Sequence, residues 1–149
     1  MQVSDWIALL SAFVAILSAL YARHSVQEAR RANEIGLHNE KLKVFKGILD
    51  LRAKLSANGI NIKEYELFSF YEYVQLSEFY FNKRIYEKVK DYFDDAWEVV
   101  KLRGLWEAAE EGDKKKEIVQ KTHDMLRQAR EKAGTLETML KEHLRISET

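Results

Sequence analysis

The sequence predicts an all-α protein: one N-terminal transmembrane helix continues into a long cytoplasmic helix, which packs in an antiparallel bundle of about four helical segments. Three observations predict this class. The 149 residues contain no proline and only six glycines, so little in the composition would break a long helix. A long uncharged run lies near the N-terminus. Beyond it, apolar residues recur at steps of three and four.

The composition excludes several function classes. Lys plus Arg and Asp plus Glu number 24 each, so no net charge draws the protein to nucleic acid or to an acidic surface. Cysteine is absent, which removes disulfides, thiolate metal sites and cysteine nucleophiles. We therefore expect no cofactor.

Residues 1–22 are predicted to form the transmembrane anchor. No charged residue lies between Trp6 and Ala22. At ~1.5 Å per residue this stretch covers roughly 25 Å, close to the ~30 Å of a hydrocarbon core. Trp6, Tyr21 and Arg23 are predicted to lie at the membrane interfaces.

Two other interpretations of this stretch compete with the anchor. A cleaved signal peptide would have a basic start and a small-x-small cleavage site, and Leu20-Tyr21-Ala22 fits that site poorly. A buried helix of a soluble protein can be equally apolar. If the stretch spans a membrane, Arg23, Arg30 and Arg31 on its C-terminal side place the remainder of the chain in the cytoplasm and the N-terminus outside.

Residue sizes within the first helix are sorted by face. A seam of small residues follows alternating steps of four and three, and a serine recurs every seven residues along its edge. Such sorting predicts close helix neighbours, and hence a homo-oligomer, because lipid alone does not require it. The predicted pore-lining or helix-contact residues are Ala8, Ser11, Ala12, Ala15, Ser18, Ala19, Ala22, Ser25, Ala29 and Asn33.

Two interpretations of the serine row stay open. The hydroxyls of Ser11, Ser18 and Ser25 can bond carbonyls of their own helix, or fill a dry helix contact. Alternatively, helices gathered in a ring would line a narrow, water-filled passage with these hydroxyls. Without a ring of charges such a passage would select poorly between ions.

The remaining chain is predicted as a helical neck over residues 23–41 and a cytoplasmic helical bundle over residues 42–149. Asn58 or Gly59 is expected to take the left-handed conformation that ends the first helix. Asn61 is expected to cap a second helix that runs to about Phe81.

A third helix, capped by Asn82, is predicted from Lys83 to about Glu111, and a fourth follows Gly112-Asp113. Most aromatic residues lie between Tyr65 and Trp106, so the two middle helices are expected to supply most of the core volume. The predicted inward positions of the third helix are Ile85, Val89, Tyr92, Phe93, Ala96, Trp97, Val100 and Leu105.

Few residue patterns in the sequence indicate catalysis or metal binding. No glutamate stands three residues before a histidine, and no two histidines lie within one turn, so we expect no metal site. Arg31 and His38 fit the loose Arg-x(4–6)-His pattern of helical ribonucleases of the HEPN type. They are the ribonuclease candidates; a surface arginine and a neck histidine are the alternative.

The segment from Ser77 to Tyr86, together with an N-terminal span that runs directly into a long helix, resembles small membrane proteins encoded beside bacterial antiphage systems. The family it resembles is the HEPN-like membrane accessory protein of type VI-B CRISPR systems. The resemblance implies a multimeric pore in the bacterial inner membrane, depolarisation as an antiviral defence, and a protein or ribonucleoprotein partner. Of the HEPN signature, only Arg31 and His38 have counterparts here.

Three hypotheses about the function therefore remain. The first is an oligomeric, single-pass membrane protein that forms a pore or depolarises the membrane. The second is a membrane-tethered scaffold or adaptor that binds a protein partner through residues 65–106. The third is a membrane-bound ribonuclease.

Overall fold

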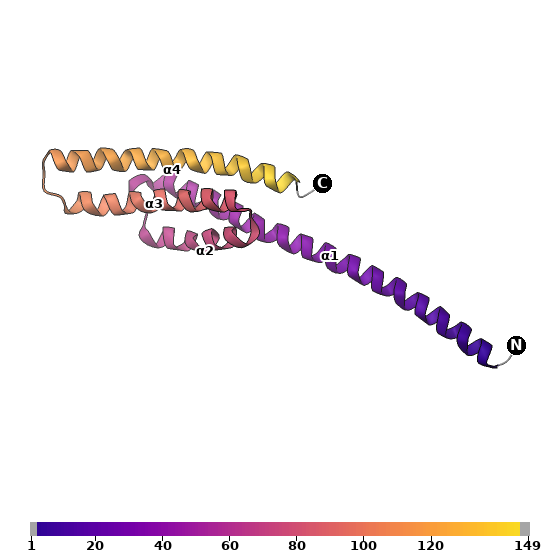
Figure 1. The fold of residues 1–149 in the computed structure, drawn as a ribbon. Coiled ribbons are helices and arrows are strands. Elements are labelled where there is room, and N and C mark those ends of the chain that lie inside the picture. The colour runs from indigo at the N-terminus through magenta and orange to yellow at the C-terminus, as the bar shows by residue number, and fades with distance from the viewer. Residues whose placement is uncertain (1–2, 147–149) are drawn as a thin grey trace. The chain divides into compact units, whose positions relative to one another are not determined.

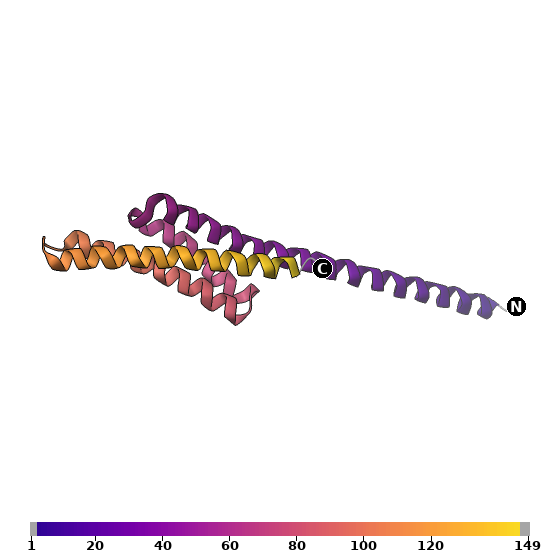
Figure 2. The same ribbon diagram turned by 90° about the horizontal axis from the view of Figure 1, so that it is seen from above.

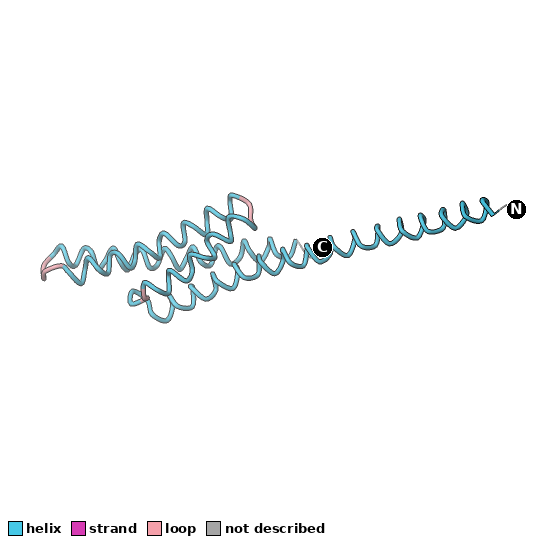
Figure 3. The backbone as a smooth tube through the Cα atoms, turned by 90° about the horizontal axis from the view of Figure 1, so that it is seen from below, coloured by secondary structure: helices cyan, strands magenta, loops and turns pink. Residues whose placement is uncertain are grey.

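The computed structural model describes residues 3–146, and every regular element in that range is helical (Figures 1 and 3). Four α-helices and one short 3-10 helix follow each other with turns of only a few residues. The bounds are α1 Val3–Asn58, η1 Gly59–Asn61, α2 Glu64–Tyr80, α3 Lys83–Ala108 and α4 Asp113–Ile146. The predicted all-α class, with a long apolar N-terminal helix and a packed bundle, is confirmed.

Helix α1 is continuous for 56 residues and covers most of the predicted anchor, the neck and the first segment of the bundle. The chain divides into two units between Leu37 and His38, both of which lie inside α1. The first residues of the predicted anchor, 1–2, and the last residues of the predicted bundle, 147–149, lie outside the described residues.

The second unit is a four-helix bundle built from residues 38–58 of α1 with α2, α3 and α4. Consecutive segments run antiparallel, as short connections favour (Figures 1 and 2). Side-chain contacts join each segment to two neighbours, so the four close into one bundle. Representative contacts are Gly47 with Tyr73 for α1–α2, Phe68 with Trp97 for α2–α3, Asp95 with Lys132 for α3–α4, and Arg52 with Glu137 for α1–α4.

The core consists of one apolar stripe from each segment. Successive buried positions are mostly three or four residues apart, the spacing that puts them on one face of a helix. The fully buried large side chains are Val44, Ile48, Leu51 and Leu55 of α1, Ile62 of the turn, Leu67 of α2, Val89, Tyr92 and Val99 of α3, and Thr122, Leu136 and Leu140 of α4.

The predicted helix ends are partly confirmed. Gly59 has φ 57° and takes the left-handed position, whereas Asn58 keeps φ −94°. Asn82 caps α3, because its side-chain oxygen accepts from the Ile85 N–H at 3.0 Å.

The predicted Asn61 cap is wrong. Asn61 is the last residue of η1, and α2 begins only at Glu64, after Lys63. The Glu66 carboxylate accepts from the Lys63 backbone N–H at 2.8 Å, so a carboxylate in the first turn takes over the capping role.

Two predictions about α3 also need correction. The helix ends at Ala108 rather than near Glu111, and Leu105 is 59% exposed rather than inward. The physical reason is visible in Figures 1 and 2: the α3–α4 end of the bundle extends past the α1–α2 turn. Arg103 still contacts the α1–α2 turn, and the last residues of α3 follow it.

The aromatic residues of α2 supply less core volume than predicted. Its buried face consists of Leu67, Phe70, Val74 and Ser77. The other face exposes four large rings, those of Tyr65, Phe68, Tyr71 and Phe79.

Two arginines hold the turn between α1 and α2. The Arg103 guanidinium of α3 donates to the Ile62 carbonyl at 2.7 Å and the Ile60 carbonyl at 3.3 Å. Arg130 of α4 donates to the Leu55 carbonyl at 2.8 Å. Carbonyls at the end of a helix lack partners in their own helix and carry the negative end of its dipole, so cationic donors stabilise this turn.

Gly47 sets how closely α1 approaches α2. A Cβ at this position would lie 2.5 Å from the Tyr73 ring, so the Gly47→Ala variant must displace that ring. We expect a loss of about 1–3 kcal/mol in the free energy of unfolding, the usual effect of overpacking. Urea unfolding in mild detergent, followed by circular dichroism, measures it.

Gly134 provides the matched control. It lies inside α4, where an added Cβ would meet no atom within 4 Å, so Gly134→Ala adds the same methyl group without a clash. We expect that variant to gain up to ~1 kcal/mol from helix propensity. Equal effects of the two substitutions would contradict the close α1–α2 contact.

Candidate functional site: the uncovered N-terminal helix

The N-terminal part of α1 has no covering partner within the protein. From Trp6 to Leu37 every side chain is exposed. Even Leu17, the least exposed of the large apolar side chains between Trp6 and Tyr21, is 50% exposed. Length and composition would let this helix cross a membrane, and none of its apolar window is buried. The interpretation as a core helix buried within this chain is therefore wrong.

The structure places all ten predicted pore-lining or helix-contact residues on this uncovered stretch. Ala15 and Ser18, at the centre of the seam, are both exposed, and so are Trp6, Tyr21 and Arg23 at the predicted interfaces. The seam is thus open to a neighbouring helix along its whole length.

The serine hydroxyls along the edge of the seam form no hydrogen bond within the described chain. Among the residues described, Ser11, Ser18 and Ser25 donate to no carbonyl. By contrast, the Ser77 hydroxyl in the bundle donates to the Val74 carbonyl at 2.6 Å and the Thr122 hydroxyl donates to the Ile118 carbonyl at 2.7 Å. Both interpretations of the serine row, a dry helix contact and a water-filled passage, stay predictions.

Apolar exposure continues beyond the predicted span. Val26 is 52% exposed and Ile35 56%, although Arg23, Arg30 and Arg31 put this part of α1 outside hydrocarbon. The neck thus leaves these apolar side chains uncovered by any other described residue of the chain.

The ribonuclease candidates have different surroundings. Arg31 is exposed in the first unit, and His38 is half-buried in the second. Within the described range, no group of three or more His, Asp or Glu side chains is placed to hold a metal ion. A catalytic role for Arg31 and His38 stays a prediction.

A lysine–histidine pair that sequence reasoning missed lies near the end of α4. The Lys41 Nζ lies 3.4 Å from the His143 Nε2, and the His143 ring lies 5.4 Å from the Phe81 ring, between centroids. Burial, and then the charge of Lys41, lower the pKa of His143 below its usual 6.5. The residues are 102 positions apart in the chain, so no local pattern signals the pair.

The bundle core also holds one phenol without a partner. The Tyr92 hydroxyl is buried and makes no hydrogen bond, and burial raises the pKa of Tyr92 far above 10, so it stays neutral. Nearby on α3, Asp95 is paired with Lys132 at 2.6 Å. The Tyr92 hydroxyl lies in the packed core and offers no substrate an approach, whereas the Asp95–Lys132 pair is only half-buried.

Comparison with protein-family models, curated proteins and solved structures finds no match for this chain. We therefore describe the site by its geometry alone. It is an apolar helix that no other described part of the chain covers from Trp6 to Leu37, with small and hydroxyl side chains along one side.

The Lys41–His143 contact predicts a pH dependence of stability. The folded state holds the pKa of His143 below 6.5, so the unfolded chain binds this proton more readily. We expect the free energy of unfolding to fall as the pH drops below about 6.5, and to level off once the folded state is protonated too. Urea unfolding at a series of pH values measures the slope.

The His143→Gln variant is the control, because it keeps a polar side chain but cannot take up a proton. Its unfolding free energy should depend less on pH between about 7 and 5 than that of the wild type. An identical slope in both proteins would show that burial and the Lys41 charge do not lower the pKa of His143 in the folded state.

Proposed function

We propose that the protein is an oligomeric, single-pass membrane protein whose α1 helices assemble into a pore or closed gate that can depolarise the membrane. One observation carries the proposal: from Trp6 to Leu37 the chain itself covers no side chain of α1. Lipid can cover Trp6 to Ala22, and copies of the same helix would cover the exposed Val26 and Ile35 beyond it.

The serine row supports an assembly in which these hydroxyls face a common axis. Ser11, Ser18 and Ser25 repeat every two turns and leave their hydroxyls free of the helix backbone throughout the described chain. A ring of α1 helices would turn them towards a common axis, where water or a facing hydroxyl satisfies them. No charged residue lies between Trp6 and Ala22, so such a path would dissipate a gradient rather than select an ion.

The proposed setting is the bacterial inner membrane, with the N-terminus outside and the bundle in the cytoplasm. Arg23, Arg30 and Arg31 on one side of the span support this orientation. A role in antiviral defence is supported by the resemblance of the architecture to the CRISPR accessory family, and would give the bundle the task of receiving the signal.

The second candidate function is a membrane-tethered adaptor with dry, fully packed spans. The observation that favours it is on the bundle: four large rings of α2 are exposed, including Phe79 at 80%. Exposed rings on one helix mark a docking surface. This candidate shares the anchor and the oligomer with the first but not the conduction.

The Ser18→Leu substitution distinguishes the two. It fills the proposed passage with an apolar side chain at its midpoint, so the leak of a small dye from vesicles containing the protein should fall at least about tenfold, through steric block and dewetting. The Val14→Leu variant adds a methylene group on the bulky face and should leave the leak unchanged.

A homo-oligomer is expected for both variants in mild detergent, measured by mass photometry or light scattering. A wild-type protein that is monomeric there contradicts the assembled helices. An oligomer that never leaks, and whose Ser18→Leu variant behaves like the wild type, supports the adaptor. The Arg31→Ala/His38→Ala double variant should leak like the wild type.

A further inference from the structure

The exposed surface of α2 combines rings with negative charge. Among the described residues of the bundle, five large apolar side chains are exposed, and four of them belong to α2: Tyr65, Phe68, Tyr71 and Phe79. The same helix carries Glu64, Glu66, Glu72 and Glu78 and has no lysine, arginine or histidine. The chain as a whole is neutral, so this acidity is local.

Two of the four rings of this surface, Phe68 and Tyr71, belong to a ladder of aromatic contacts between α2 and α3. Phe68 contacts Trp97 with ring centroids 5.2 Å apart, Trp97 stacks on Phe93 at 6.2 Å, and Phe93 contacts Tyr71 at 5.5 Å. The rings of the ladder are therefore ordered before any partner arrives, which lowers the entropy cost of binding.

A groove between α2 and α3 opens at one end of the ladder. Tyr71, Tyr86 and Phe93 supply its aromatic walls, and the carboxylates of Glu78 and Asp94 lie at it. Its volume is about 140 Å³, enough for one large side chain but below the roughly 300–1,000 Å³ of a small-molecule site. The groove thus fits an anchoring side chain of a protein partner.

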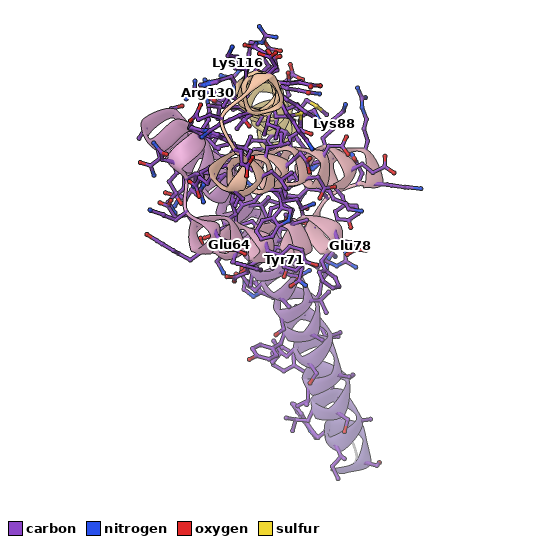
Figure 4. The ribbon with its side chains drawn as sticks, turned by 90° about the vertical axis from the view of Figure 1, so that its left-hand side faces the viewer. Glu64, Tyr71, Glu78, Lys88, Lys116 and Arg130 are labelled. Carbon is purple, nitrogen blue, oxygen red and sulfur yellow. The ribbon has the colours of Figure 1, made fainter. Side chains whose placement is uncertain are left out.

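The carboxylates at the groove have no partner in the bundle. Neither Glu78 nor Asp94 forms an ion pair within the described range. Figure 4 shows Glu64, Tyr71 and Glu78 along α2, on the opposite side of the bundle from Lys116 and Arg130 of α4. The basic groups of α4 are therefore not available to neutralise this face.

We propose that the α2–α3 groove binds an arginine of a basic, helical protein segment, with Tyr71 and Phe93 stacking on the guanidinium and Glu78 and Asp94 pairing with it. Aromatic faces and carboxylates both attract cations, and a planar guanidinium can use both at once. The same carboxylates repel phosphate, so this face suits neither nucleic acid nor an anionic lipid surface. Because the groove lies in the bundle, the inference does not depend on a pore.

A substitution of Lys90 tests the proposal directly. Lys90 also lines the groove and has no ion-pair partner in the described chain, so its ammonium competes with an incoming guanidinium. The Lys90→Met variant should therefore bind the partner more tightly, while keeping a side chain of similar length.

The experiment uses the full chain in detergent and a fluorescent, amphipathic helical peptide with an arginine in every turn of one face. Binding is followed by fluorescence anisotropy at low and moderate salt. We expect Tyr71→Ala and the double variant Glu78→Gln/Asp94→Asn to raise the Kd at least roughly tenfold, and Lys90→Met to lower it several-fold. The matched controls, Glu117→Gln on α4 and Leu105→Ala on α3, replace side chains outside the groove and should change nothing.

The same peptide with citrulline in place of arginine keeps the shape and removes the charge, and should bind at least roughly tenfold more weakly. Equal binding of the citrulline peptide would overturn the proposal. So would an unchanged Kd in the carboxylate variants. Dissociation of the oligomer by Tyr71→Ala, without any peptide binding by the wild type, would assign the surface to a second copy and overturn it as well.

Discussion

The structure depends on one constraint: α1 has packing partners within the chain only along its last third. From Val44 to Leu55 its apolar stripe is covered by the bundle, whereas no other part of the described chain covers Trp6 to Leu37. Apolar surface of this extent suits a membrane or another protein surface better than water. The first unit is long and apolar enough to cross a membrane.

The bundle differs in this respect, because its own side chains cover or hydrogen-bond nearly all the groups that it buries. Its turn at Gly59 is closed by guanidinium groups from Arg103 and Arg130, and its α1–α2 contact leaves no room for a methyl group at Gly47. What the bundle leaves open is the α2 face, where ordered rings and unpaired carboxylates meet. The two units thus present different surfaces, one that suits lipid and like helices and one that suits a cationic partner.

The first of these surfaces can be predicted from the sequence, whereas the second cannot. Ala15 and Ser18 repeat with a helical period among bulky neighbours, so their face could be predicted without a structure. In α2 rings occur on both faces, and periodicity alone does not tell the buried Phe70 from the exposed Phe68. Only the position of α3 decides between them. Likewise, asparagine is a residue type that often caps helices, but the Glu66 carboxylate takes this role instead of Asn61.

The hydroxyl groups distinguish the two units most directly. In the bundle, Ser77 and Thr122 are fully buried and donate to carbonyls of their own helices, so neither hydroxyl is left unsatisfied. On α1, Ser18 has the same kind of carbonyl four residues back and does not use it in the described structure. An unbonded hydroxyl in hydrocarbon costs free energy. The hydroxyls of the bundle are thus already used, whereas those of Ser11, Ser18 and Ser25 are left for water or for a neighbouring helix.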